Sequence, residues 1–212
     1  MRQNDPSTVR VIGLTGGVGS GKSSVAYLLE RDYHAFLLIA DEIARDLMQP
    51  GQISYKQIVD YFGPEVILPD GQLDRAKLSD LVFDKPEELA KLNSFVHPHV
   101  VGVILEAIAL LKESGEYPYI VVESAILFDV KYEAFCDEVW YVYANETVRR
   151  QRLMENRGYS VEKIESIEKN QRPHEDFLMR SDVAIDNSGD MEALEKRIAE
   201  AICGSNAPED MI

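Results

Sequence analysis

The sequence predicts an α/β fold in which a parallel sheet is flanked by helices. The first observation is an apolar run at 9–14 that stops at a cluster of glycines, which is typical of a buried strand feeding a loop. Residues 22–31 then carry apolar side chains at helical spacing, and a second apolar run at 35–40 ends abruptly at Asp41. Strand, loop, helix and strand in this order form a βαβ unit, which implies parallel strands joined by a right-handed crossover.

The rest of the chain continues with short apolar runs and helical patterns. Runs at 119–122, 138–143 and 183–185 predict three more strands. His97-Pro98 is expected to end or kink the helix before it, because the residue before proline avoids the α region. Further helices are expected at 42–48, from about 86 toward 97, and at 100–112, 145–158, 160–171 and 191–202.

Charge and composition narrow the range of possible functions. The 212 residues include 22 Lys and Arg against 37 Asp and Glu, a net charge of −15. Binding along a nucleic-acid backbone is driven by cations that neutralise phosphates, so this balance argues against nucleic-acid partners. A local basic pocket can still hold a small anion. The 45% hydrophobic content argues against disorder, and the length fits one domain.

The N-terminus and the cysteines indicate a protein of the cytoplasm. Residues 1–9 are polar and lack the apolar centre of a signal peptide. No stretch is expected to approach the roughly 18 apolar residues that span a membrane. Cys136 and Cys203 lie in no metal-ligand spacing, so we expect reduced thiols packed as small hydrophobic groups.

The glycine cluster fits the phosphate-loop pattern G-x-x-x-x-G-K-[ST] at residues 16–23. Glycines let the backbone turn its N–H groups toward an anion, and the following helix adds the positive end of its dipole. Lys22 reaches the β- and γ-phosphates, and the Ser23 hydroxyl can ligate Mg²⁺. The expected phosphate-binding residues are Gly17, Gly19, Ser20, Gly21, Lys22, Ser23 and Ser24.

This loop predicts a nucleoside triphosphate site within a P-loop fold, but it does not specify the reaction. The Asn-Lys-x-Asp motif by which GTPases read guanine is absent, and the chain is short for a helicase or a transporter ATPase. A small P-loop phosphotransferase remains the favoured class. A nucleoside or nucleotide kinase, and a regulator that binds a nucleoside triphosphate without transferring phosphate, stay open as alternatives.

Two acids follow predicted strands. The carboxyl ends of parallel strands meet at one edge of the sheet, so Asp41 should face the same crevice as the phosphate loop. A carboxylate there can accept the proton of an attacking hydroxyl, although an Asp before a helix also serves as an N-cap. Glu123 follows the third strand, where an acid can hold Mg²⁺ or its water, or can simply be solvated.

A group of arginines stands out in this acidic chain. Arg149, Arg150, Arg152 and Arg157 lie on one expected helix. Residues 149 and 152 share a face, whereas 150 and 157 lie on another, so only some of them can reach phosphate. The group predicts a lid whose arginines stabilise charge on the transferring phosphoryl group.

Taken in order, these motifs resemble the dephospho-coenzyme A kinase family from about Val11 to Ile202. The resemblance is carried by the phosphate loop, by the segments 40–45, 74–78 and 82–83, by His97-Pro98-His99, by 152–157 and by 185–189. It implies transfer of the ATP γ-phosphoryl group to the ribose 3′-hydroxyl of dephospho-CoA, the last step of coenzyme A synthesis. The implied cofactors are ATP and Mg²⁺.

The resemblance also assigns site residues. Asp41 matches the catalytic Asp that ends the Asp-Ala-Asp motif of the family, whose first Asp is Ile39 here. Phe177 stands where a basic residue usually follows the lid glutamine, Gln171, which shifts phosphate binding toward the arginines. The implied catalytic residues are Asp41, Lys22 and Arg152; Arg149, Arg157 and Asn187 are implied nucleotide contacts, and Ser23 and Glu123 implied metal ligands.

The implied organisation is one domain over 9–205. Its core covers about 9–42, 117–145 and 181–203, a helical acceptor-binding insertion covers about 43–115, and a helical lid covers about 147–180. Residues 204–212 are expected to form a flexible tail. The expected partners are ATP, held by the phosphate loop, and dephospho-CoA, held between core and insertion. No nucleic acid and no membrane are expected, and the protein is expected to be cytoplasmic and is favoured to be a monomer.

Overall fold

A single five-stranded sheet lies at the centre of the fold, in the order β2-β3-β1-β4-β5. The computed structural model describes residues 9–204. β1 pairs in parallel with β3 and β4, and β4 pairs in parallel with β5, so the predicted α/β class is confirmed. The strands are β1 Arg10–Thr15, β2 Ala35–Ile39, β3 Tyr119–Glu123, β4 Glu138–Tyr143 and β5 Val183–Asp186.

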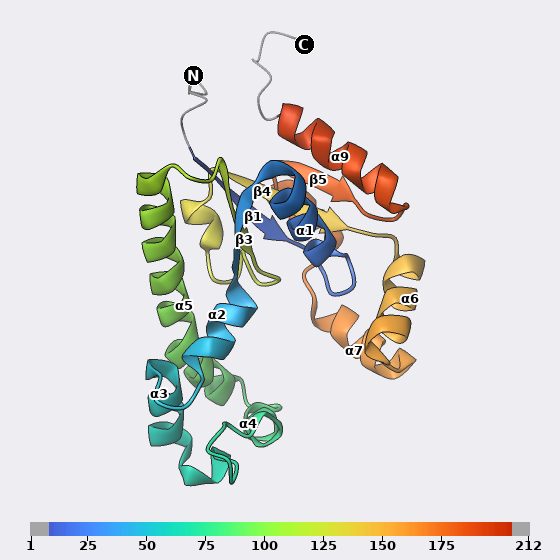
Figure 1. Ribbon diagram of the computed structural model, residues 1–212. Coiled ribbons are helices and arrows are strands. Elements are labelled where there is room, and N and C mark those ends of the chain that lie inside the picture. The colour runs from blue at the N-terminus through green and yellow to red at the C-terminus, as the bar shows by residue number, and fades with distance from the viewer. Residues whose placement is uncertain (1–8, 205–212) are drawn as a thin grey trace. The chain divides into compact units, whose positions relative to one another are not determined.

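Two compact units make up the chain. We call Met1–Leu38 with Leu110–Ile212 the core unit, and Ile39–Ala109 the helical unit. Of the flexible tail predicted for 204–212, Gly204 is instead the last residue of the helix Met191–Gly204, and residues 205–212 lie outside the described range. The core unit contains α1 Lys22–Tyr33, η2 Tyr132–Phe135, α6 Glu146–Arg157, α7 Val161–Asn170, α8 His174–Arg180 and α9 Met191–Gly204 (Figure 1). The helical unit contains α2 Ala40–Leu47, α3 Ile53–Phe62, η1 Pro64–Val66 and α4 Arg75–Val82, and α5 Pro86–Ser114 runs from this unit into the core unit.

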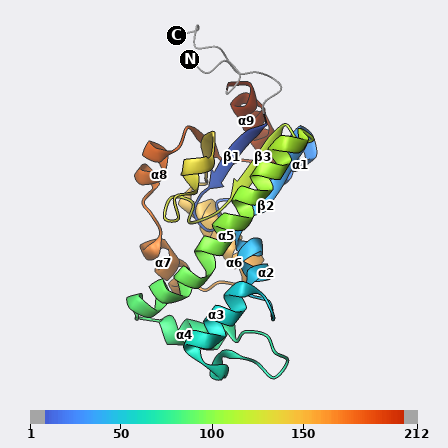
Figure 2. The same ribbon diagram turned by 90° about the vertical axis from the view of Figure 1, so that its left-hand side faces the viewer.

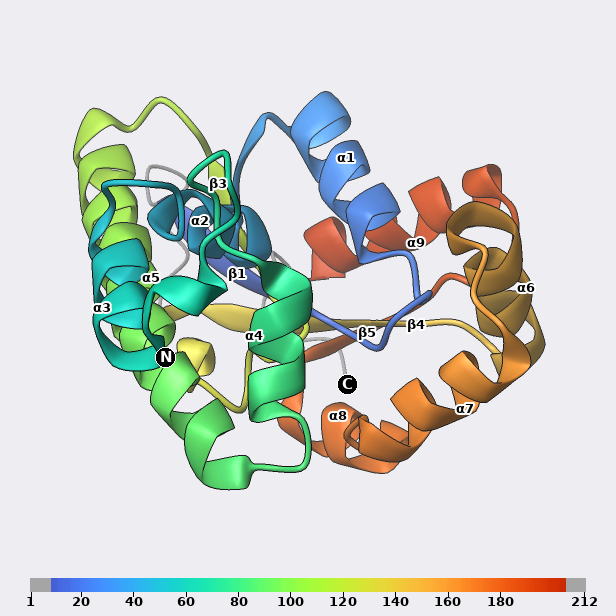
Figure 3. The same cartoon turned by 90° about the horizontal axis from the view of Figure 1, so that it is seen from below.

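Within the core unit, the alternation of side chains along β4 separates the two faces of the sheet. Trp140 and Val142 pack with α1 and α9 in the main hydrophobic core. Tyr141 points to the opposite face, where it stacks on Phe177 of α8. Figure 3 shows α1 and α9 on one side of the strands and α8 on the other.

Of the two outcomes expected at His97-Pro98, an end or a kink, the first is wrong, because helix α5 does not end there. It continues through Pro98 as one helix of 29 residues (Figure 2). Val96, Val100, Ile104 and Ile108 recur at a spacing of four and form a buried stripe on both sides of the proline. A proline in a helix interior costs about 3 kcal/mol, and burial of several branched side chains at about 1.5–3 kcal/mol each outweighs it.

The same helix corrects the expectation that no stretch approaches the length of a membrane span. Of the helices in the described range, α5 alone passes a length-and-hydropathy test, with a mean hydropathy of 1.7 over its most apolar 18 residues. One such helix is weak evidence, because a mostly buried core helix of a soluble protein passes the same test; 22% of this window is buried. The match therefore does not by itself place the chain in a membrane.

The two cysteines differ in their surroundings. Cys136 is half-buried beside Gly13, where an added Cβ would lie 2.9 Å from the Cys136 Sγ, and burial raises the pKa of its thiol to about 12. Cys203, on the last turn of α9, is exposed, so the expectation of two packed thiols was wrong for this one. Neither forms a disulfide.

We expect the two thiols to react at different rates, because the thiolate is the reactive form. At about pH 8, a chromogenic disulfide reagent should titrate Cys203 rapidly in the native protein and reach Cys136 only after denaturation. Counting fast and slow thiols before and after adding guanidinium measures this. Rapid modification of Cys136 in the native Cys203→Ser variant would contradict it.

The packing of α9 on the sheet gives a stability prediction. Ile198 is fully buried in the core formed with α1 and the strands, whereas Met191 on the same helix is 52% exposed. Ile198→Ala should lower the free energy of unfolding by about 2–5 kcal/mol, because it leaves a cavity in a packed core. Met191→Ala should change the free energy of unfolding by less than about 0.5 kcal/mol. Urea unfolding followed by circular dichroism compares them, and equal losses would refute the assignment of α9 to the core.

Candidate functional site

The phosphate loop connects the end of β1 to the start of α1, as predicted. Gly21 ends the loop with φ of 90° and ψ of 30°, a left-handed conformation that disfavours a side chain. A Cβ at this position would lie 2.0 Å from the Asn187 side-chain nitrogen. Both the backbone conformation and the lack of space therefore require glycine here.

The carbonyl of Ser20 is held from outside the loop. The Asn187 side-chain amide donates to it over 2.9 Å, and an Arg152 guanidinium nitrogen lies 3.5 Å from the same oxygen. Asn187 is buried, and its backbone N–H donates to the Tyr143 carbonyl over 2.7 Å. The turn after β5 and the helix α6 thus both contact the loop at the Ser20 carbonyl.

Lys22 and Glu123 approach each other at the carboxyl edge of the sheet. Leu14 pairs with Glu123 across β1 and β3, so Glu123 is level with the last residues of the strand that precedes the loop. Its carboxylate is 3.8 Å from the Lys22 ammonium, which also donates to the Gly16 carbonyl over 2.9 Å. Both side chains are largely shielded from solvent, so their opposite charges attract more strongly than they would in water.

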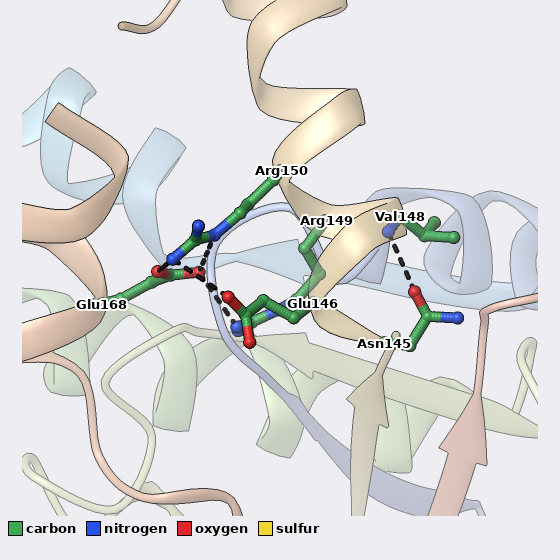
Figure 4. A network of polar contacts seen from close by, with 6 residues as sticks. All are labelled: Asn145, Glu146, Val148, Arg149, Arg150 and Glu168. Carbon is green, nitrogen blue, oxygen red and sulfur yellow. Dashed lines mark hydrogen bonds and ion pairs between the residues drawn. The ribbon is translucent and has the colours of Figure 1, made fainter. Parts of the chain in front are cut away.

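Arginines of α6 are divided among different partners. Arg149 lies over the start of the loop: a Cβ on Gly17 would be 3.2 Å from its Nη1 and 2.8 Å from the Gln171 Oε1. Arg152 contacts the Ser20 carbonyl. Arg150 turns to Glu146 and Glu168 instead (Figure 4), and the hydrogen bond that it donates to Glu168 raises its pKa. Arg157 ends α6 with an exposed side chain and is not brought to the loop.

A cavity of about 710 Å³ adjoins the loop on the α8 side of the sheet. Gly17, Ser20 and Arg149 line one part of it, and aromatic residues of β4 and α8 line another. Tyr141 stacks on Phe177 with ring centroids 4.7 Å apart, and its hydroxyl is 2.9 Å from the His174 Nδ1. Burial raises the pKa of Tyr141, so the hydroxyl stays protonated at neutral pH.

Phe177 brings no cation to the site, and its surroundings explain why an aromatic ring is accommodated. The ring is buried between Tyr141 and Phe128. Arg172, which the sequence analysis did not single out, pairs with Asp129 and Asp176, and so joins the start of α8 to the loop after β3. The spacing of Tyr141 and Tyr143, two residues apart along β4 and hence on one face of the sheet, was the signal that could have revealed this aromatic face.

The remaining predicted residues lie at the starts of helices. Ser23 is exposed and Ser24 half-buried in the first turn of α1. Asp41 is the second residue of α2 and is exposed. The helix begins at Ala40 with Ile39 as its N-cap, so Asp41 is not the cap that the alternative interpretation required, and no side chain caps this helix.

The donor set around the loop fits Mg²⁺ better than a structural transition metal. Within residues 9–204, no group of three or more His, Cys, Asp or Glu side chains could hold a metal ion. The Ser23 hydroxyl and the Glu123 carboxylate are hard oxygen donors. Mg²⁺ in kinase sites commonly takes one or two such protein oxygens and completes its shell with phosphate and water.

A parallel sheet with this loop after its central strand defines the class of P-loop nucleotide-binding proteins. A solved shikimate kinase from Acinetobacter baumannii shares the fold, with a TM-score of 0.54 and 15% identity over 95% of this chain and 97% of that one. The family model for dephospho-CoA kinase matches residues 10–193. The chain therefore belongs to the dephospho-CoA kinase family.

Individual relatives agree with this assignment. A dephospho-CoA kinase of Carboxydothermus hydrogenoformans is 40% identical over 89% of this chain and 90% of its own. A dephospho-CoA kinase of Geobacter sulfurreducens is 36% identical over 91% of this chain and 96% of its own. A solved structure from Thermus thermophilus is 31% identical with a TM-score of 0.81, covering 95% of this chain and 100% of that one.

Replacement of Gly21 tests the loop geometry. Gly21→Ala should weaken ATP binding by about tenfold or more, because the new Cβ displaces the Asn187 amide and strains the left-handed backbone. Gly158 is the matched control, since it has φ of 61° but open space around it. Gly158→Ala should cost about 1 kcal/mol of stability and leave ATP binding unchanged. Calorimetric titration measures both, and undiminished binding by Gly21→Ala would contradict the geometry.

Proposed function

We propose that this chain transfers the γ-phosphoryl group of ATP to the ribose 3′-hydroxyl of dephospho-CoA, giving CoA and ADP as the final step of coenzyme A synthesis. The observation that carries the proposal is the family match over residues 10–193, which includes a phosphate loop of the required geometry. The loop supplies inward N–H groups, and family membership supplies the acceptor.

On the ATP side, the loop residues 17–24 hold the phosphates, and Lys22 neutralises the β- and γ-oxygens. Arg149 and Arg152 approach the loop from α6 and stabilise charge on the transferring group. We assign Ser23 and Glu123 to Mg²⁺, which when bound offsets phosphate charge. Asn187, next to Gly21, is assigned to the nucleotide side, and Arg157 is assigned to the nucleotide after the lid closes.

On the acceptor side, Asp41 is the proposed general base. Its exposed carboxylate orients the 3′-hydroxyl and takes its proton while the hydroxyl oxygen forms a bond to the γ-phosphorus. The bond between that phosphorus and the β,γ-bridging oxygen breaks, and the electron pair leaves with ADP. Lys22 and the two arginines stabilise the charge on the equatorial oxygens during transfer.

The proposal extends to the setting of the reaction. We assign the predicted insertion at 43–115 to acceptor binding and the segment 147–180 to the lid. We further infer a cytoplasmic monomer whose partners are its two small substrates. The net charge of −15 argues against nucleic acid as a partner.

One assay tests the reaction. The purified chain is incubated with ATP, Mg²⁺ and a panel of acceptors comprising dephospho-CoA, nucleosides and nucleotides. Phosphorylation of dephospho-CoA at rates far above those of the other acceptors supports the proposal. Preference for a nucleoside would assign another acceptor, and ATP binding without any product would assign a regulator.

The Asp41→Asn variant tests whether Asp41 is the general base. Turnover should fall by about 10²-fold or more while ATP binding persists, because the amide cannot accept the hydroxyl proton. Glu42→Gln, which neutralises the next exposed acid on α2, should leave turnover within about twofold. Steady-state rates with calorimetric ATP binding separate the two effects, and near-normal turnover of Asp41→Asn would remove Asp41 from the mechanism.

A further inference from the structure

Glu168 on α7 is the point where two consecutive arginines of α6 converge (Figure 4). Its Oε1 accepts from the Arg149 Nη2 over 3.3 Å, and its Oε2 accepts from the Arg150 Nη2 over 2.8 Å. The Arg150 Nε is a further 3.5 Å contact to Oε1. All three side chains are partly buried, which makes the contacts stronger than those of a surface pair.

The two arginines use Glu168 in different ways. Arg150 binds it through two nitrogens and also lies 3.0 Å from Glu146, so its charge is fully engaged. Arg149 touches Glu168 through Nη2 alone. Its Nη1 lies beside Gly17, and its buried Nε has no hydrogen-bond partner.

An unpartnered buried donor is costly unless something completes it. Arg149 lines the cavity that adjoins the loop, and its Nη1 lies beside Gly17, where an anion would accept from it. A guanidinium presents its donors as a rigid fork, so fixing one nitrogen orients the others.

We propose that Glu168 is a positioning residue, which holds the Arg149 guanidinium over Gly17 so that its remaining donors meet a phosphate of ATP. The proposal rests on the proposed function, since it takes ATP as the ligand of the loop. Arg150 has the complementary task of offsetting the negative charge that Glu168 brings near the phosphates.

Holding Arg149 in place lowers the conformational-entropy cost of binding ATP. A long arginine side chain loses rotamer freedom when it grips a ligand, and a side chain that is already held loses less. A carboxylate so close to the site would repel phosphate if it stood alone. The two contacts from Arg150 make the positioning compatible with an anionic ligand.

The test is a double-mutant cycle on the full chain, read by calorimetric titration with ATP and Mg²⁺. Glu168→Ala should weaken ATP binding about fivefold, because Arg149 is no longer held. Arg149→Ala should weaken it about tenfold. Adding Glu168→Ala to Arg149→Ala should cause no further loss, since the side chain to be positioned is gone.

Two further variants sharpen the comparison. Glu168→Gln keeps the shape and an acceptor oxygen for Arg149, so its affinity should lie between wild type and Glu168→Ala. Glu165→Ala removes the same charge from an exposed position on the same helix and should bind ATP as wild type does. Thermal unfolding of each variant checks that the lid helices remain folded.

Tighter ATP binding by Glu168→Ala would overturn the proposal, because Glu168 would then be a competitor for Arg149. An equal loss with and without Arg149 would also overturn it, since it would show a general effect on α7. The Lys22→Ala variant distinguishes a failure of the Glu168 proposal from a failure of the proposed function. If the wild-type chain does not bind ATP, or Lys22→Ala binds it equally well, the ATP site itself is wrong.

Discussion

The hydrogen bond from the Asn187 amide to the Ser20 carbonyl is the contact on which the shape of the phosphate loop depends. A loop that turns its N–H groups inward must turn carbonyls outward, and a carbonyl shielded from water needs a donor. Asn187 supplies the donor and leaves room only for hydrogen at Gly21. Because the Asn187 backbone is tied to Tyr143, the loop is fixed to β4 as well as to β1.

This dependence explains which parts of the site could be predicted from sequence. The phosphate loop and the acids after β2 and β3 are local patterns, and their positions follow from strand order and parallel pairing. The structural role of Asn187 joins residues 167 positions apart, and no local pattern encodes it. Helical spacing predicted that Arg149 and Arg150 lie on different faces of α6, whereas the contact of both with Glu168 depends on the position of α7. At Pro98, side-chain burial outweighed a backbone preference that sequence reasoning had applied alone.

The net charge of the chain differs in sign from the charge of the side chains that meet the phosphate loop. A net charge of −15 describes the protein as a whole, whereas the phosphate loop meets Lys22, Arg149 and Arg152. Carboxylates also lie there, and two of them are engaged with cations: Glu123 with Lys22, and Glu168 with Arg149 and Arg150. At such distances, partly shielded from water, local pairs outweigh distant surface charges screened by salt.

The single tryptophan has a practical consequence for following this molecule by optical methods. Trp140 lies fully buried in the core unit, and the helical unit contains no tryptophan. Its fluorescence therefore reports the environment of the sheet alone, whereas far-ultraviolet dichroism sums the helices of both units. A difference between the two signals during denaturation separates the melting of one unit from that of the other without any added label.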